Sequence, residues 1–284
     1  MSSKTLATGS GQLFNFLGNR FVYAVISQRA SGLLIGVEMN PDKKCNFDCV
    51  YCCVDRAPDG ERHTFSLRTM SAELKDLLQR HRLNRFKELP TFSNVPEDLL
   101  KLKGVSLSGE GEPTLCPRFS EVVEEIIRIR NSGQWPVFKI VLITNGTGLS
   151  LPAVQKGLRL LSLTDEIWVK LDAGSFEKMR DINKSPVSLS AIIDNIVTLG
   201  QWRPVIIQSL FCSLNEAEPE DEDMDLYIQR LLEIRDQGAD ISAVQIYSIV
   251  RPPAHPGCGR LSLNQLSLIA KRVRSETGLN VEVY

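Results

Sequence analysis

Three cysteines lie within one short stretch of this sequence, Cys45-Asn-Phe-Asp-Cys49-Val-Tyr-Cys52. The spacing C-x3-C-x2-C predicts three thiols around one point. Cysteine thiolates are the usual protein ligands of iron–sulfur clusters. Three ligands on a four-iron cluster leave one iron open to a small chelating molecule. We therefore expect Cys45, Cys49 and Cys52 to hold a [4Fe-4S] cluster.

Other chemistry for these thiols explains the spacing less well. Structural zinc usually takes four ligands in two separated pairs, and the sequence has no second C-x2-C pair. Cys49-Val-Tyr-Cys52 has the spacing of a redox pair, but that interpretation leaves Cys45 unexplained. A non-catalytic protein that binds iron–sulfur or zinc remains the alternative from another functional class.

Four further cysteines lie outside the trio. Cys53 follows it directly, and Cys116, Cys212 and Cys258 lie at or just past the ends of predicted strands. Such thiols could ligate an auxiliary cluster or donate a hydrogen atom to a substrate radical, or they could be small buried hydrophobic side chains. His255 lies near Cys258 and is a candidate for substrate contact.

Alternating strands and helices must position these residues. The predicted strands are residues 34–39, 104–108, 139–144, 166–172, 204–212 and 243–249. The predicted helices are residues 71–81, 118–131, 152–161, 189–199, 221–237 and 262–276. Strands separated by helices favour right-handed crossovers and a parallel sheet. The predicted fold is α/β, a partial (β/α)6 TIM-like barrel over residues 31–284. Residues 1–30 are predicted to be a flexible N-terminal arm and extension, and the last helix closes the chain.

Polar side chains recur on one face of several predicted strands, because residues i and i+2 of a strand share a face. The polar sets are Ser106, Ser108, Glu110 and Glu112; Lys170 and Asp172; Gln208 and Cys212; Gln245 and Tyr247. The interior of a purely structural barrel is usually apolar. The pattern therefore predicts a lined cavity at the carboxyl ends of the strands, where parallel α/β folds place their active sites.

Composition limits the partners. The chain of 284 residues carries 33 Lys and Arg against 34 Asp and Glu, a net charge of −1. This excludes a globally basic nucleic-acid binder, although residues 80–87 form a local basic patch. No apolar run approaches the ~18 residues of a membrane span. The polar N-terminus and the odd count of 7 cysteines favour a cytoplasmic protein without a disulfide framework.

The motif CNFDCVYC resembles the cluster motif of the radical S-adenosylmethionine (radical SAM) superfamily. Residues 108–114 (SGEGEPT) resemble its glycine–glutamate–proline motif. The segments TNGT (144–147) and VKLDAG (169–174) follow in the expected order. Within the superfamily, the chain looks most like the branch that contains the wyosine-base tRNA-modifying enzymes and their relatives.

The resemblance implies a second cofactor, S-adenosylmethionine, chelated by the open iron through its amino and carboxylate groups. Glu110 or Glu112 would accept hydrogen bonds from the amino group, and Gly109 and Gly111 would let the backbone approach the ligand. Lys170 would face the carboxylate, and Tyr51 would meet the adenine. The candidate contacts to the ribose are Asn145, Asp172 and Gln208.

The resemblance also implies the reaction. The reduced cluster would donate one electron to S-adenosylmethionine and form a 5′-deoxyadenosyl radical that abstracts hydrogen from a substrate. A one-electron donor of the flavodoxin or ferredoxin type is implied. The near-neutral charge favours a small molecule or modified nucleobase as substrate, and a wyosine-like tRNA-modifying enzyme is the alternative. The wyosine enzymes carry additional N-terminal cysteines, whereas this sequence has none before Cys45.

Overall fold

The structure is a computed structural model that describes residues 16–56, 64–254 and 256–284. The first half of the predicted arm, residues 1–15, and His255 lie outside the described residues. The chain divides into two compact units. The first comprises residues 1–44, 56–142 and 151–165, and the second comprises residues 45–55, 143–150 and 166–284.

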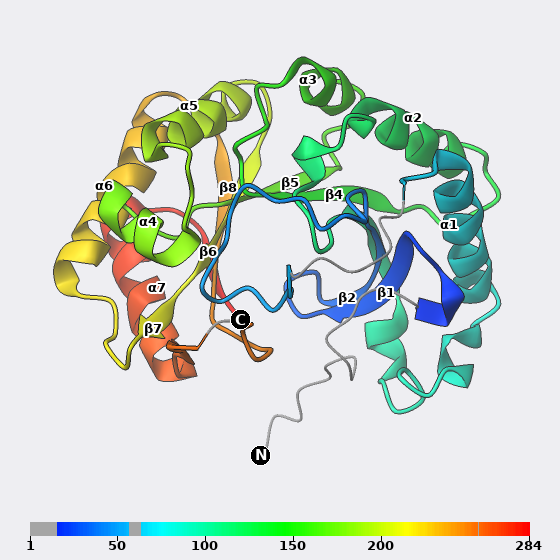
Figure 1. Cartoon of the computed structure of the whole chain (residues 1–284), viewed down its shortest axis with the longest axis horizontal. Coiled ribbons are helices and arrows are strands. Elements are labelled where there is room, and N and C mark those ends of the chain that lie inside the picture. The colour runs from blue at the N-terminus through cyan, green and yellow to red at the C-terminus, as the bar shows by residue number, and fades with distance from the viewer. Residues whose placement is uncertain (1–15, 57–63, 255) are drawn as a thin grey trace. The chain divides into compact units, whose positions relative to one another are not determined.

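The first unit is a layer of strands covered by helices (Figure 1). Its strands are β1 (Val22–Ser27), β2 (Gly32–Val37), β3 (Leu102–Leu107) and β4 (Lys139–Thr144), whose last two residues count with the second unit. Its helices are α1 (Leu67–Arg82), α2 (Phe119–Arg130) and α3 (Pro152–Leu158), with short 3-10 turns η1 (Phe16–Gly18), η2 (Arg85–Glu88), η3 (Glu97–Leu100) and η4 (Pro113–Leu115). Strands β2, β3 and β4 are parallel, and β1 pairs antiparallel with β2.

Local sequence explains these elements. All six residues of β2 (GLLIGV) are buried, as expected for a strand covered on both faces. Helix α2 buries Val122, Ile126 and Ile129, which lie on one helical face. Glu73 of α1 accepts hydrogen bonds from the backbone N–H groups of residues 20–22. This carboxylate therefore fixes the start of β1 against α1.

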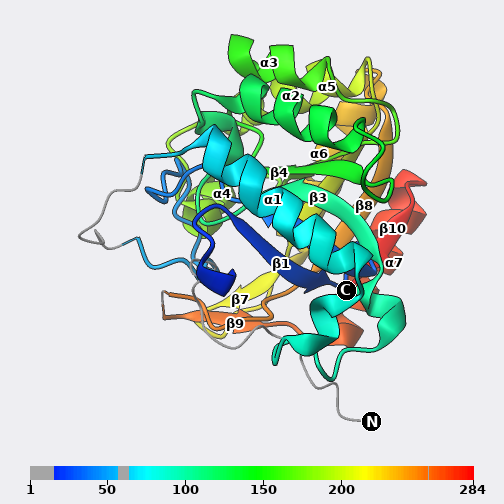
Figure 2. The same cartoon turned by 90° about the vertical axis from the view of Figure 1, so that its right-hand side faces the viewer.

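The second unit is also α/β, and its main strands are all parallel. They run in the order β5 (Glu166–Lys170), β6 (Val205–Leu210), β8 (Ile241–Tyr247) and β10 (Val281–Val283). The helices are α4 (Phe176–Asn183), α5 (Leu189–Gly200), α6 (Asp221–Asp236) and α7 (Leu263–Thr277). Strands β7 (Cys212–Leu214) and β9 (Cys258–Arg260) form a separate antiparallel pair (Figure 2).

The sequence-based prediction of an α/β fold is confirmed, since all six predicted strands and all six predicted helices form. The sequence analysis missed α4, the six-residue strand β1 and the three-residue strands β7, β9 and β10. Strand β1 lies in residues 16–30, the part of the predicted extension that the structure describes. No helix among the described residues has the length and apolar character needed to cross a membrane.

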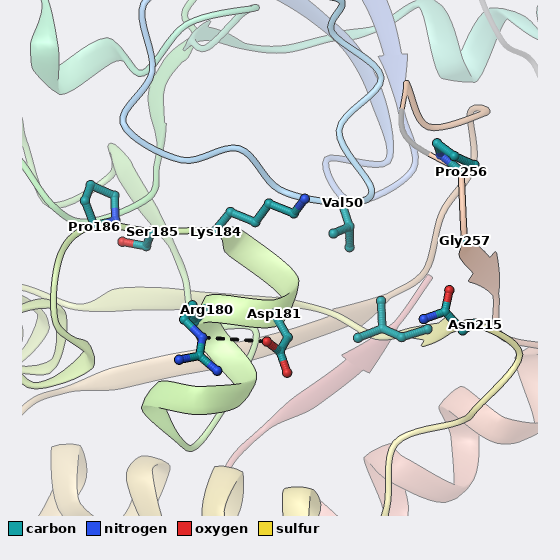
Figure 3. A pocket seen from close by; sticks show the side chains of 10 residues that line it. Val50, Arg180, Asp181, Lys184, Ser185, Pro186, Asn215, Pro256 and Gly257 are labelled. Carbon is teal, nitrogen blue, oxygen red and sulfur yellow. Dashed lines mark ion pairs between the residues drawn. The ribbon is translucent and has the colours of Figure 1, made fainter.

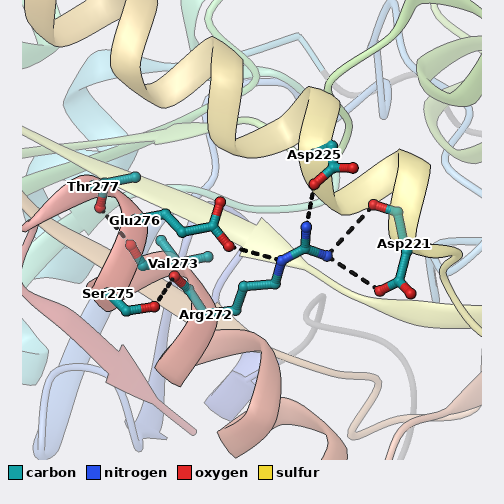
Figure 4. A network of polar contacts seen from close by, with 7 residues as sticks. All are labelled: Asp221, Asp225, Arg272, Val273, Ser275, Glu276 and Thr277. Carbon is teal, nitrogen blue, oxygen red and sulfur yellow. Dashed lines mark hydrogen bonds and ion pairs between the residues drawn. The ribbon is translucent and has the colours of Figure 1, made fainter.

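Arg272 joins α7 to α6 on the surface of the second unit (Figure 4). Its guanidinium contacts Asp221 at 3.2 Å, the carboxylate of Asp225, and Glu276 of its own helix at 2.9 Å. Because these carboxylates are largely exposed, water and salt screen the pairs. We expect Arg272→Met to lower the free energy of unfolding by about 1 kcal/mol or less. Urea titration at low and at high salt checks this, and a loss that does not shrink at high salt contradicts the electrostatic explanation.

Candidate cofactor site

The cysteine loop, residues 45–53, is held against the end of α4 by main-chain hydrogen bonds. The N–H of Asp48 donates to the carbonyl of Asn183 at 3.0 Å, and the N–H of Val50 donates to the carbonyl of Ile182 at 2.8 Å. The carbonyl of Cys52 accepts the N–H of Ala254 at 2.7 Å. Main-chain hydrogen bonds therefore hold the loop at Asp48, Val50 and Cys52.

N–H groups point at two of the three predicted ligand sulfurs. The backbone N–H of Phe47 donates to Cys45 Sγ at 3.4 Å, and Asn145 Nδ2 donates to the same sulfur at 3.9 Å. Asn183 Nδ2 donates to Cys49 Sγ at 3.4 Å. Hydrogen bonds to cysteine sulfur stabilise thiolates and tune iron–sulfur clusters. This donor set fits the predicted cluster.

Burial raises the pKa of the Cys49 thiol to about 11, against the lowering effect of the Lys170 charge. Among the described residues, no three Cys, His, Asp or Glu side chains are gathered closely enough to hold one metal ion. A four-iron cluster spreads its thiolate ligands over several irons and places them farther apart than a single ion does.

Tyr51 lies at the centre of a polar network with Lys170. The Lys170 ammonium donates to the hydroxyl of Tyr51 at 3.0 Å and to that of Tyr247 at 3.4 Å. It also lies 4.8 Å from the centre of the Tyr51 ring, a cation–π distance. Burial, and then the nearby Asp172 carboxylate, raises the pKa of Tyr51 well above its ordinary value. The tyrosine is therefore a neutral hydrogen-bonding group.

Asp172 is buried and accepts hydrogen bonds within the chain. Its carboxylate accepts from the Tyr51 hydroxyl, from Asn183 Nδ2 at 2.7 Å and from the backbone N–H of Leu210 at 2.8 Å. The structure thus gives this predicted ribose contact a second role, joining the cysteine loop to β5, β6 and α4. Lys170 and Asp172, which were predicted to share a strand face, both contact the Tyr51 hydroxyl of the cysteine loop.

Two predicted ribose contacts lie in separate surroundings. Asn145 donates to Asn46 Oδ1 at 2.8 Å and accepts from the Thr147 hydroxyl at 2.7 Å, so the loop after β4 binds the cysteine loop. Gln208 is fully buried, and its Nε2 donates to Gln245 Oε1 at 2.9 Å. Gln208 Oε1 has no hydrogen-bond partner among the described residues. It remains available as an acceptor.

The predicted glycine–glutamate loop, residues 109–112, belongs to the first unit and lies over a carboxylate that the sequence analysis missed. Glu38 accepts the backbone N–H of Glu110 and, at 2.7 Å, that of Asn40. A Cβ atom at Gly109 would collide with Glu38, and one at Gly111 would collide with Asn40. The two glycines therefore make room for this chain's own side chains.

The two predicted amino-group contacts differ in their surroundings. Glu112 accepts from the backbone N–H of Thr114 at 3.1 Å and from its hydroxyl at 2.6 Å, and so caps η4. Glu110 is buried, with its carboxylate 4.0 Å from the Lys43 ammonium. The backbone N–H of Glu112 donates to the carbonyl of Lys44, the residue before Cys45.

Two of the remaining cysteines lie together. The register of β7 and β9 sets Leu214 opposite Cys258 and Cys212 opposite Arg260, so the two cysteines are diagonal neighbours. Both cysteines pack on the same apolar cluster of the second unit. Cys116 is buried in the first unit. Cys53 is half-buried beside the trio.

Asn183 is a second residue of this site, after Glu38, that the sequence analysis missed. It lies at the end of α4, in a segment not predicted as a helix, and touches Cys49, Tyr51 and Asp172. Its segment, FEKMRDINKS, begins two residues after VKLDAG, one of the segments that carry the family resemblance, and this was the available signal.

We expect Asn183→Leu to lower the free energy of unfolding by about 2 kcal/mol, because the buried Asp172 carboxylate loses a donor. Urea unfolding of the metal-free protein measures this change, with exposed Asn94→Leu as the control. A loss equal to that of the control would show that the hydrogen bond contributes nothing.

The chain is similar to several known proteins. A "UPF0026 protein" of Helicobacter pylori strain J99 is 26% identical over 188 residues, which cover 63% of this chain and 52% of that protein. The chain spans about half the length of the curated relatives it matches.

Two solved structures share the fold. A radical SAM methyltransferase from Sphaerobacter thermophilus gives a TM-score of 0.64 at 16% identity, covering 93% of this chain and 68% of that one. TYW1 with a lysine-pyruvate adduct bound gives 0.58 at 16% identity, covering 87% and 74%. The partial-barrel prediction is thereby confirmed. The family model "Radical SAM superfamily" matches residues 39–201, which include the cysteine loop, the glycine–glutamate loop and Lys170. The chain belongs to the radical SAM superfamily.

Proposed function

We propose that this chain is a radical SAM enzyme that binds a [4Fe-4S] cluster through Cys45, Cys49 and Cys52 and binds S-adenosylmethionine beside it. Together, the bound cluster and S-adenosylmethionine would supply a 5′-deoxyadenosyl radical for hydrogen abstraction from a substrate. The observation that carries the proposal is the cysteine loop, whose sulfurs accept N–H groups from Phe47 and Asn183.

The chain's own residues would hold and orient the ligands. Lys170, at the carboxyl end of β5, supplies a positive charge beside Tyr51. That charge suits the carboxylate of S-adenosylmethionine. The buried acceptor Gln208 Oε1 suits a hydroxyl group. The buried Glu110 would accept hydrogen bonds from the amino group of S-adenosylmethionine. Glu112 would instead help to hold the loop in place, because it caps η4.

We propose a small molecule or a modified nucleobase as substrate. A tRNA binder must neutralise several phosphates, and the net charge of −1 gives little support to that alternative. A low-potential one-electron donor of the flavodoxin or ferredoxin type would reduce the cluster. The remaining alternative is a non-catalytic protein that binds iron–sulfur or zinc. Such a protein would not need the Lys170 cation and the buried Asp172 carboxylate that contact Tyr51 of the cysteine loop.

Metal analysis after anaerobic reconstitution tests the proposal. We expect about four iron and four sulfide per chain. Addition of S-adenosylmethionine should then change the electron paramagnetic resonance spectrum of the reduced cluster, because the ligand binds the open iron. Zinc without iron, or a spectrum that S-adenosylmethionine leaves unchanged, would overturn the proposal.

A further inference from the structure

A cavity of about 740 Å³ opens beside the cysteine loop (Figure 3). Val50 lines it from the cysteine loop, and Arg180, Asp181 and Lys184 line it from the end of α4. Asn215 and Gly257 lie on another side. All of its lining residues belong to the second unit. Its volume lies within the range of small-molecule sites, about 300–1,000 Å³.

The position of Lys184 is set by the backbone. The N–H of Lys184 donates to the carbonyl of Arg180 at 3.1 Å and caps α4. The residues just before it, Ile182 and Asn183, bind the cysteine loop through their carbonyls. The base of the lysine side chain is therefore fixed relative to Val50, and the side chain extends toward Val50 (Figure 3).

Lys184 adopts a conformation that its side chain does not favour. Its φ is 47° and its ψ is 41°, in the left-handed region where a helix C-cap usually has glycine. A residue with a Cβ atom is disfavoured there. Strain of this kind gathers at functional sites, where the side chain is needed for another reason.

The charges on the wall of the cavity are mainly positive. Arg180 Nε lies 3.8 Å from Asp181 Oδ1, and both side chains are mostly exposed, so this pair is weak. Within the described part of the chain, the Lys184 ammonium has no carboxylate within ion-pair distance. Val50 and Leu214 add apolar surface. A ligand with an anionic group next to an apolar body would contact both the positively charged side chains and the apolar surface of the cavity.

We propose that this cavity binds the substrate, and that the substrate is a small molecule bearing a phosphate or carboxylate group that Lys184 receives. The proposal rests on the proposed function, because it assigns the molecule on which the radical would act. Val50 lies between two of the predicted cluster ligands, so a molecule that contacts Val50 is close to the cysteine loop.

Binding can be tested on the cluster-free protein, separately from any reaction. The probes are nucleoside 5′-monophosphates and small carboxylates, each measured by calorimetry against its uncharged nucleoside or amide. We expect at least one anionic probe to bind better than its neutral counterpart. Lys184→Gly should weaken that probe at least about tenfold, as loss of a charged hydrogen bond predicts.

The glycine variant also separates binding from folding. Because glycine accepts the left-handed backbone, the melting temperature of Lys184→Gly should be unchanged or raised. Asn84→Gly, at another left-handed position in the first unit, is the matched control and should bind as the unchanged protein does.

Intact tRNA is measured in the same way as the small probes. Three results would overturn the proposal: no anionic probe binds, binding survives in Lys184→Gly, or only the intact tRNA binds. None of them bears on whether S-adenosylmethionine is cleaved, so failure of the substrate site and failure of the radical chemistry are distinguishable.

Discussion

Cys45→Ala should remove both the iron–sulfur cluster and the cleavage of S-adenosylmethionine. Each of the three thiols is expected to hold one iron, and a cluster with two protein ligands is exposed to loss of iron. Iron in the reconstituted variant should fall from about four per chain to near zero. The visible absorbance of the cluster should be lost with it. The first ligand is chosen because its sulfur accepts two N–H groups, one from Phe47 and one from Asn145.

Cys53→Ala is the control for this prediction, since Cys53 is adjacent to the trio yet is not assigned as a ligand. It should retain iron, sulfide and product. If Cys45→Ala retained a full cluster, or if Cys53→Ala lost it, the ligand assignment would be wrong. Circular dichroism of both metal-free variants would establish that the chain still folds.

Glu38 should make the stability of the protein depend on pH. Burial raises the pKa of this carboxyl to about 7, against the lowering effect of backbone hydrogen bonds from Glu110 and Asn40. The folded state therefore keeps a proton that the unfolded chain releases near its ordinary pKa of 4.5. This stabilisation is complete below pH 4.5 and is lost as the pH rises to about 7. The pKa difference corresponds to about 3 kcal/mol.

Urea unfolding of metal-free protein from pH 4.5 to pH 8 measures this dependence. Glu38→Gln should flatten the curve, because a neutral amide cannot ionise. Glu97→Gln replaces an exposed carboxylate and should leave the slope unchanged. Equal slopes in the unchanged protein and in Glu38→Gln would contradict the shifted pKa.

Hydrophobic patterning predicted most of the longer elements, but it missed β1, which has six residues. Strand β4 was predicted at the bounds it has, because its run KIVLIT is continuous and buried. Helix α4 was missed because it has only eight residues, FEKMRDIN, and four of those before the buried Asn183 are charged. Strands β7 and β9 have three residues each, and only their pairing across the chain identifies them.

The residues of the candidate site can also be divided into those that the sequence predicts and those that it does not. The cysteine spacing and the alternation of β5 are enough to single out the trio, Lys170 and Asp172, because both patterns are local in the sequence. Glu38 and Asn183 could not be predicted from local sequence patterns. Their roles depend on contacts with residues that are 72 and 134 positions away along the chain. The glycines of the 109–112 loop are predicted to let the backbone approach the ligand, and the structure places Glu38 and Asn40 where a Cβ atom of Gly109 or Gly111 would lie.

The central claim is that this chain cleaves S-adenosylmethionine at the cysteine loop. The most direct measurement is 5′-deoxyadenosine, quantified after the anaerobically reconstituted protein is reduced with dithionite in the presence of S-adenosylmethionine. We predict that 5′-deoxyadenosine and methionine form in equal amounts, and that neither forms with Cys45→Ala. An intact four-iron cluster that yields no 5′-deoxyadenosine, with or without an anionic probe that binds the cavity beside Lys184, would contradict the account.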